Sequence, residues 1–221
     1  MKRIVDRLKS IYGAPEAPRA VEPFAIVLYE NVAYLASDER RAAAFDELRK
    51  RVGLSPVAIA RAPLATLRAV ARVGGVYPEL RSSRMREAAR IVIEEFGGDA
   101  ASAFAEPPPR RRRLLKKFPA IGDPGVDRML LFRRIEPVAA LDSNGLRVLV
   151  RVGYGIESKS YSATYRSVQR ALGAFTAKDF ALLIDAYSLL ARHGRELCKR
   201  AAPLCEPCPL KQSCVYYSTL A

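Results

Sequence analysis

Long apolar runs are missing from this 221-residue sequence. No run approaches the ~20 residues that a membrane-spanning helix needs. The first residues, Met1 to Tyr12, have a basic beginning, but Asp6, Arg7 and Lys9 interrupt the apolar core that a secretory signal requires. We therefore interpret this segment as a short amphipathic helix and expect a cytoplasmic protein without a membrane partner.

Acidic residues are also scarce relative to basic ones. The sequence has 23 Asp and Glu against 37 Lys and Arg, which gives a formal net charge of +14. Such an excess points to a polyanionic partner, and nucleic acid is the simplest candidate. Half of the residues are apolar, which is enough to bury a sizeable core in one large or two small domains.

Cysteine is limited to four residues, and all four lie in one stretch near the C-terminus. The order Cys198-x6-Cys205-x2-Cys208-x5-Cys214, with a proline on each side of Cys208, predicts one stiff loop around a single inorganic centre. Two disulfides are disfavoured because they belong to oxidising compartments. A zinc site is an alternative, although only Cys205 and Cys208 have the short spacing of a zinc knuckle. A four-cysteine iron-sulfur cluster fits the single loop best.

Apolar residues recur at helical rather than strand spacing along most of the chain. Pro56, preceded by a serine, and Pro63 are typical first residues of short helices. Ser82 or Ser83 is expected to cap a longer helix that stops at Gly97-Gly98. Helices therefore fit the pattern better than strands.

A proline-rich break, Pro107 to Pro109, precedes six cations in eight residues. Such a run by itself is typical of a solvated face. Two apolar helical segments follow, joined by a tight turn with glycines at Gly122 and Gly125. A turn that opens a helix can hold a phosphate with its backbone amides, and an ordinary helical hairpin is an equal alternative. The candidate DNA-binding residues of this region are Arg110, Arg111, Arg112, Lys116, Lys117, Phe118, Pro119, Ala120, Ile121, Gly122, Asp123 and Gly125.

Asp142 or Asn144 is well placed to cap another helix, which would contain Leu146, Leu149 and Val150. From these residues alone, a helix cap is the favoured interpretation. A last long helix is expected from about Lys178 to His193, and Gly194 would end it and lead into the cysteine loop. The lone histidine, His193, would lie in the last turn of this helix, where the dipole favours a cation.

These motifs resemble, in the same order, those of the endonuclease III family of DNA glycosylases. The cysteine spacing is similar to the family's cluster loop, including the preceding His193-Gly194-Arg195. The residues from Phe118 to Gly122 occupy hairpin positions that usually read Leu-Pro-Gly-Val-Gly, with Ala120 in place of a glycine. Asp142-Ser143-Asn144 is similar to the family's Asp-Thr-His. The resemblance covers roughly residues 24 to 216.

The resemblance implies an all-α protein of two helical domains with a DNA groove between them. Residues 24–136 would form a six-helix domain with the helix-hairpin-helix, and residues 1–23 together with 137–221 would form an iron-sulfur domain. The implied cofactor is a [4Fe-4S] cluster, and the implied partner is double-stranded DNA in the nucleoid. We expect a monomer. The implied cluster ligands are Cys198, Cys205, Cys208 and Cys214.

The activity implied by the resemblance is base-excision repair, in which a damaged or mismatched base is flipped from the duplex and cleaved from its sugar. Asp142 would stabilise oxocarbenium character on the deoxyribose and orient the attacking water, and its position at a helix N-terminus would keep it ionised. Bifunctional members carry a lysine where this chain has Pro124, and no lysine lies between Lys117 and Lys159. We therefore predict a monofunctional DNA glycosylase without efficient lyase activity at abasic sites.

Base recognition is predicted from two further segments. Glu30 and Asn31 occupy positions that reach the flipped base and its orphaned partner in the family, and a surface or capping role is an equal alternative. The loop from Val76 to Pro78 is a candidate wedge or an ordinary surface turn. Three other functions stay open: an inactive iron-sulfur DNA-binding protein, a bifunctional glycosylase with lyase activity, and a zinc-stabilised nucleic-acid module.

Overall fold

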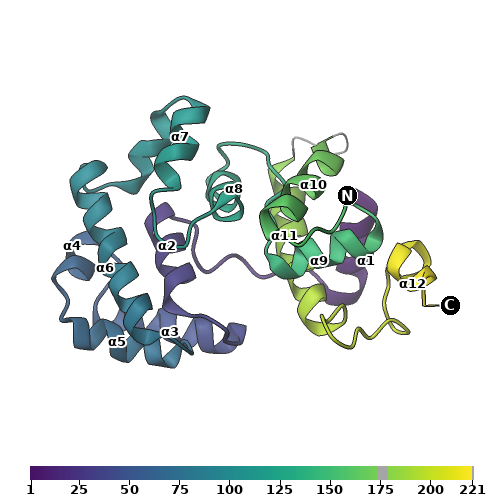
Figure 1. Ribbon diagram of the computed structural model, residues 1–221, viewed down its shortest axis with the longest axis horizontal. Coiled ribbons are helices and arrows are strands. Elements are labelled where there is room, and N and C mark those ends of the chain that lie inside the picture. The colour runs from purple at the N-terminus through teal and green to yellow at the C-terminus, as the bar shows by residue number, and fades with distance from the viewer. Residues whose placement is uncertain (174–178, 221) are drawn as a thin grey trace. The chain divides into compact units, whose positions relative to one another are not determined.

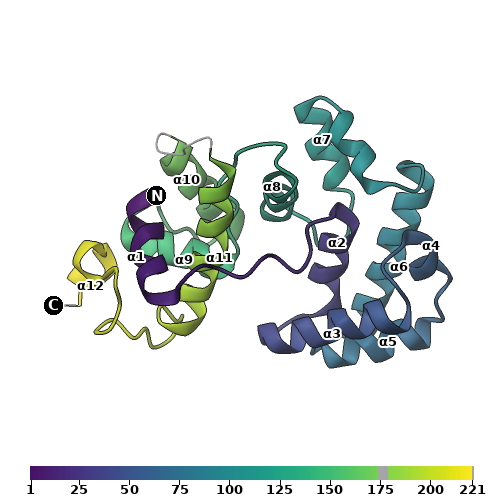
Figure 2. The ribbon, with the colours of Figure 1, turned by 180° about the vertical axis from the view of Figure 1, so that it is seen from behind.

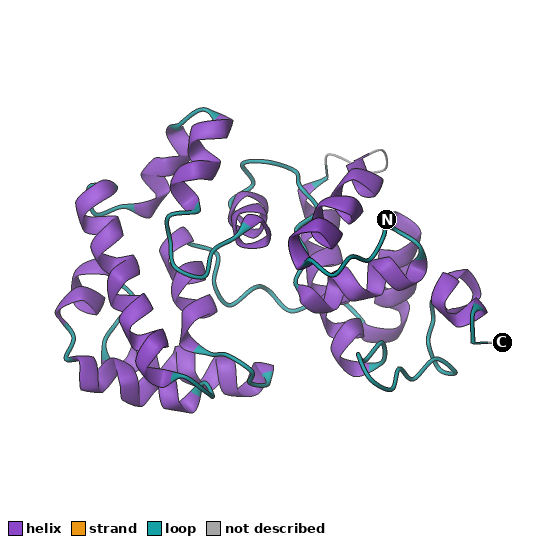
Figure 3. Cartoon of the chain, viewed as in Figure 1, coloured by secondary structure: helices purple, strands orange, loops and turns teal. Residues whose placement is uncertain are grey.

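The computed structural model describes residues 1–173 and 179–220 of the chain. Within these ranges the regular structure is helical, as Figures 1 and 3 show, and the one β interaction is an isolated bridge between Tyr34 and Gly75. The all-α fold class predicted from the sequence is confirmed. None of the helices in the described ranges has the length and apolarity needed to cross a membrane.

The chain divides into two compact units. The central unit comprises Arg19–Met129, and the terminal unit comprises Met1–Pro18 together with Leu130–Ala221. The central unit contains α2 Pro23–Val32, α3 Asp38–Arg51, α4 Pro56–Arg61, α5 Leu64–Val73, α6 Pro78–Glu95, the 3₁₀ helix η1 Ala100–Ala105, α7 Pro108–Leu115 and most of α8 Asp123–Phe132. The terminal unit contains α1 Lys2–Tyr12, α9 Ser143–Val152, α10 Tyr161–Gly173, α11 Phe180–Glu196, the 3₁₀ helix η2 Lys211–Ser213 and α12 Val215–Ser218.

Helix α6 organises the central unit, because α2, α4 and α5 all pack against it. Its start differs from the sequence prediction: Pro78 is the first residue, and Ser82 and Ser83 lie inside the helix rather than at its cap. Proline suits this first position because its missing N–H has no helical partner there. Ser82 instead donates from its hydroxyl to the Glu79 carbonyl at 2.8 Å. The predicted stop is close to the observed one, since Gly97 and Gly98 follow the last helical residue with positive φ angles.

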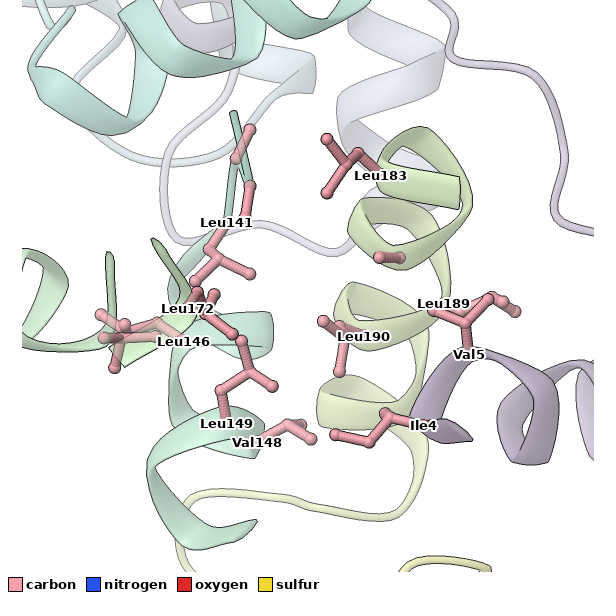
Figure 4. Close-up of a cluster of buried hydrophobic side chains, with 14 of the residues drawn as sticks. Ile4, Val5, Leu141, Leu146, Val148, Leu149, Leu172, Leu183, Leu189 and Leu190 are labelled. Carbon is pink, nitrogen blue, oxygen red and sulfur yellow. The ribbon is translucent and has the colours of Figure 1, made fainter. Parts of the chain in front are cut away.

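Helix α11 organises the terminal unit and packs against α9 on one side and α1 on another. Figure 4 shows Leu149 of α9 and Leu190 of α11 between these two helices and Leu189 on the side of α11 that faces Val5 of α1, and Figure 2 shows α1 beside α11. The apolar cluster buries residues from both ends of the chain, among them Ile4, Val5, Leu149 and Leu190. This core explains why the first helix of the sequence belongs with the last one.

Two glycines allow α9 and α11 to approach closely. A Cβ on Gly194 would lie 2.7 Å from the Asn144 Cβ, and a Cβ on Gly145 would lie 3.2 Å from that of Leu190. Gly194 is therefore an internal contact residue of α11, which continues to Glu196, rather than its stop. The predicted start of this helix at Lys178 lies outside the described residues, and Asp179 caps the described start.

Candidate functional site

The turn between α7 and α8 is anchored by apolar side chains. Phe118 and Ile121 are buried, with 2% and 6% of their surface exposed, and Phe118 stacks on Phe96 at a ring separation of 5.3 Å. Ala120, which lies between these two anchors, and Gly122, which follows the second, are exposed. The turn therefore presents backbone to solvent on a fixed apolar base.

Ala120 has a φ of 65°, in the left-handed region that favours glycine. The backbone nevertheless keeps this conformation, because the preceding residue is tied down: the Asn31 amide donates to the Pro119 carbonyl at 3.0 Å. A Cβ on Gly125 would lie 3.1 Å from Ile121 Cγ2, so the first turn of α8 packs tightly on the hairpin.

All five cations predicted to bind DNA have partners inside the central unit. Arg110 pairs with Glu106 at 3.2 Å, and Arg111 donates to the carbonyl of the same residue. Lys116 and Lys117 pair with Asp123 and Glu95. Exposed pairs of this kind contribute about 0–1 kcal/mol, so a phosphate can compete with them.

Arg112 differs from the other cations of the run. Its guanidinium donates to Asp127 Oδ1 at 2.7 Å, and the Asp127 side chain is only 5% exposed. This pair joins α7 to α8 across the hairpin. The contact gives Arg112 a structural role in addition to its predicted contact with DNA.

The two residues predicted to face a base lie at the C-terminal end of α2. Asn31 is 1% exposed, and its amide is shared between the Val27 and Pro119 carbonyls. Glu30 is partly exposed and pairs with Arg128. Burial favours the neutral form of this carboxyl, but the charges of Arg128 and Arg41 outweigh it and hold the pKa of Glu30 below its ordinary value. Their contact with a base stays a prediction.

Asp142 is the N-cap of α9. Its Oδ1 accepts from the Gly145 amide at 2.7 Å, and its Oδ2 accepts from the Asn144 side chain at 3.2 Å. Arg195 of α11 lies 3.9 Å from Oδ2, and the Asp142 side chain is 26% exposed. The capping interpretation is therefore confirmed, and the catalytic role stays a prediction.

The four cysteines are free thiols that line one pocket together with Arg151 and Tyr216. The pocket holds about 290 Å³ of empty volume, which includes open solvent. No three Cys, His, Asp or Glu side chains among the described residues are grouped closely enough to hold a single metal ion. A four-iron cluster needs a wider arrangement, since each thiolate binds a different iron. The all-thiol set on one pocket thus fits such a cluster in chemistry and in placement.

Two arginines of α9 hold the cysteine loop. Arg147 donates to the Cys198 carbonyl at 2.9 Å, to the Gly194 carbonyl at 2.7 Å and to Asn144 Oδ1 at 2.9 Å. Arg151 donates to the Lys199 carbonyl at 2.7 Å and reaches Cys198 Sγ at 3.3 Å. The four-residue spacing of the two arginines places them on one helix face, but Cys198 is 51 residues from Arg147. Sequence reasoning missed both residues because only the fold brings these segments together.

His193 lies in the last turn of α11, as predicted, but it is not a cation. The ring is 1% exposed, and burial lowers the pKa of His193 to about 4. Its Nδ1 lies 3.0 Å from the Tyr12 hydroxyl and its Nε2 lies 3.4 Å from Cys208 Sγ. The helix dipole favours a charged ring, but desolvation outweighs it here. The packing of α1 removes the solvent that the charged imidazole needs.

No family model matches the chain. Endonuclease III of Thermotoga maritima is 25% identical over 203 residues, which cover 92% of this chain and 87% of the relative. Thymine-DNA glycosylase of Aeropyrum pernix is 26% identical over 219 residues, which cover 94% and 90%.

Solved structures agree with these relatives on the fold. A trapped endonuclease III-DNA covalent intermediate superimposes with a TM-score of 0.78 at 19% identity, covering 99% of this chain and 96% of the other. A thermostable thymine-DNA glycosylase gives a TM-score of 0.68 at 18% identity, with 99% and 96% coverage. The chain therefore has an endonuclease III-like glycosylase fold.

Proposed function

We propose that the protein is a DNA glycosylase of base-excision repair that cleaves the glycosidic bond of a flipped base. The observation that carries this function is the fixed carboxylate of Asp142, held by the Gly145 amide and Asn144 at the start of α9. Relatives along most of the chain are named endonuclease III and thymine-DNA glycosylase. The net charge of +14 favours a DNA partner.

The proposed chemistry needs an anion close to the deoxyribose. As the base departs, the sugar gains oxocarbenium character, and a preorganised carboxylate stabilises that charge and orients water for attack. The cap holds Asp142 in one orientation before DNA binds, because Oδ1 is fixed by the Gly145 amide. Part of the ordering that catalysis requires is thus in place before DNA binds.

DNA contact is proposed for the exposed turn at Ala120 and Gly122 and for the cations around it. Backbone amides at the start of α8 would meet a phosphate, and Lys116 and Lys117 would exchange their exposed carboxylate partners for phosphate oxygens. Glu30 is the proposed base contact. In this proposal Asn31 does not contact the base but positions the hairpin, because its amide donates to the Pro119 carbonyl.

The experiment that tests the function is a panel of labelled duplexes followed by alkaline cleavage of abasic sites. Relatives named for thymine and uracil make thymine-guanine mismatches and uracil the first substrates, with oxidised pyrimidines and 8-oxoguanine after them. We expect release of at least one base by the wild type and a loss of 10²-fold or more in Asp142→Asn, since the amide cannot balance the sugar's charge. Retained DNA binding by the variant serves as the control.

A second function has its own support in the structure. Because Asp142 caps α9, its carboxylate has a structural role that does not depend on catalysis. An inactive DNA-binding protein would release no base from any duplex of the panel. That result would replace the glycosylase proposal.

We further propose that the glycosylase is monofunctional. Pro124, in the first turn of α8, carries no amine and cannot form a Schiff base. A solved relative in fold was captured as a covalent intermediate with DNA, which this chain is not expected to form. Borohydride treatment with abasic DNA should leave the protein unattached, and Pro124→Lys tests whether an amine at this position suffices for trapping. A strong adduct with the wild type contradicts the proposal.

A [4Fe-4S] cluster is the proposed cofactor, held by Cys198, Cys205, Cys208 and Cys214. When bound, it would supply a rigid scaffold for the loop rather than a reacting group. Burial raises the pKa of the Cys208 thiol, so binding must displace its proton. A brown protein with four irons per chain is expected, whereas a colourless protein with one zinc would contradict the proposed cofactor.

We also propose a monomer on nucleoid DNA, which light scattering with and without a duplex can test.

A further inference from the structure

A buried imidazole links the first helix to the cysteine loop. His193 is 1% exposed, and each of its ring nitrogens faces one partner: Nδ1 faces the Tyr12 hydroxyl at 3.0 Å and Nε2 faces Cys208 Sγ at 3.4 Å. Tyr12 is itself fixed, since the Arg192 guanidinium lies 4.7 Å from its ring centre and donates to its carbonyl. The proposed glycosylase chemistry uses none of these contacts.

The partners determine which nitrogen carries the proton. A neutral imidazole has one N–H, and a thiolate bound to iron carries no proton and can only accept. With Cys208 as a cluster ligand, Nε2 must therefore be the donor. Nδ1 is then an acceptor, and the Tyr12 hydroxyl donates to it. The chain of hydrogen bonds runs in one direction, from Tyr12 through His193 to the sulfur.

We propose that His193, oriented by Tyr12, donates a hydrogen bond to the Cys208 thiolate and raises the reduction potential of the bound cluster. This inference rests on the proposed [4Fe-4S] cofactor. When an electrode adds one electron to the cluster, the negative charge is shared with its sulfur ligands. An N–H aimed at a sulfur stabilises that more negative state, so its removal lowers the potential.

Cys208 is distinguished from the other ligands by its surroundings. Its sulfur has both the imidazole and the Leu210 backbone as hydrogen-bond partners. Cys198 has the Arg151 guanidinium at 3.3 Å, but that side chain also donates to three loop carbonyls. Replacing His193 therefore removes a donor to a sulfur and disturbs the cysteine loop less than replacing Arg151 would.

The test uses the full-length, cluster-loaded protein and four variants. Iron content and visible absorbance establish loading, and voltammetry gives the one-electron midpoint potential. His193→Leu should lower the potential, Tyr12→Phe should lower it by less, and His193→Gln should stay closer to the wild type because its amide can donate. Tyr161→Phe, on α10, is the control for loss of a hydroxyl and should not change the potential.

The outcomes separate this inference from the cofactor itself. A wild type without iron overturns the cofactor and the inference together. A loaded His193→Leu with the wild-type potential overturns the inference alone. If that variant fails to fold, Tyr12→Phe decides, since it removes one oxygen atom, and an unchanged potential in this variant also overturns the inference.

Discussion

Ala120 shows how one residue can carry strain at the surface that is proposed to meet DNA. Its φ of 65° costs an L-residue about 1–2 kcal/mol relative to the right-handed region. The turn keeps this geometry because Phe118 and Ile121 are buried on either side and Asn31 holds the Pro119 carbonyl. In the motif that the hairpin resembles, the position of Ala120 is usually a glycine, and the structure shows that alanine adopts here the positive φ that glycine adopts without strain.

Replacing Ala120 with glycine should stabilise the central unit. The left-handed strain is removed, while glycine adds unfolded-state entropy of about 0.5–1 kcal/mol, so a net gain of roughly 0.5–1 kcal/mol is expected. Urea unfolding measures the gain. Ala43→Gly, at an exposed position within α3, is the matched control and should lose about 1 kcal/mol. Equal losses in both variants would show that Ala120 is unstrained.

At the scale of elements, local signals in the sequence were sufficient where a helix end is determined by its own residues. Pro56, Asp142 and the glycines after α6 are of this kind. The start of α6 was missed because Tyr77 precedes it in a left-handed conformation without a side-chain cap. The order of the hairpin, the capping aspartate and the cysteine loop along the chain could be predicted from the sequence. The side chains that contact these motifs in the fold could not.

The partners could not be predicted because they depend on burial between distant segments. The neutral state of His193 requires the packing of α1, and the position of Asn31 requires the hairpin 88 residues later. Arg81 is a further example, since no feature of the flanking sequence indicates that its side chain is buried. In the structure it is 2% exposed and donates to carbonyls at the ends of α2 and α5.

Arg81 should be indispensable to the ends of these helices. It also donates to the Val76 and Gly75 carbonyls at 2.7 Å each, so one fork satisfies four backbone groups. Lysine offers its donors at a single point and cannot reach all four, so Arg81→Lys should lower the free energy of unfolding by about 2–4 kcal/mol. Arg86→Lys on the same helix is the control, because Arg86 donates to a single carbonyl in the part of the chain that the structure describes, that of Ala62. Similar small losses in both variants would contradict the role assigned to Arg81.

For the whole molecule, the 37 Lys and Arg residues are not equally available to a polyanion. Many cations already have carboxylate partners, and these pairs differ in burial. Lys117 and Glu95 are 48% and 38% exposed, whereas Asp127 opposite Arg112 is 5% exposed. Exposed pairs can be exchanged for phosphates at little cost, but a pair with a buried carboxylate cannot. The electrostatic contribution to DNA binding should therefore come from the exposed cations.

The salt dependence of binding distinguishes these two classes. Each phosphate contact changes the slope of log K against log salt by about −0.9. Lys117→Ala should reduce the magnitude of the slope by roughly one contact and change unfolding by less than about 1 kcal/mol. Arg112→Ala should instead lower the free energy of unfolding by about 3 kcal/mol, because it leaves the Asp127 carboxylate without this arginine. Lys50→Ala, in the last turn of α3, controls for general loss of charge. An unchanged slope in Lys117→Ala would remove the phosphate contact proposed for the hairpin, and a stable Arg112→Ala with a reduced slope would make Arg112 a DNA contact rather than a structural residue.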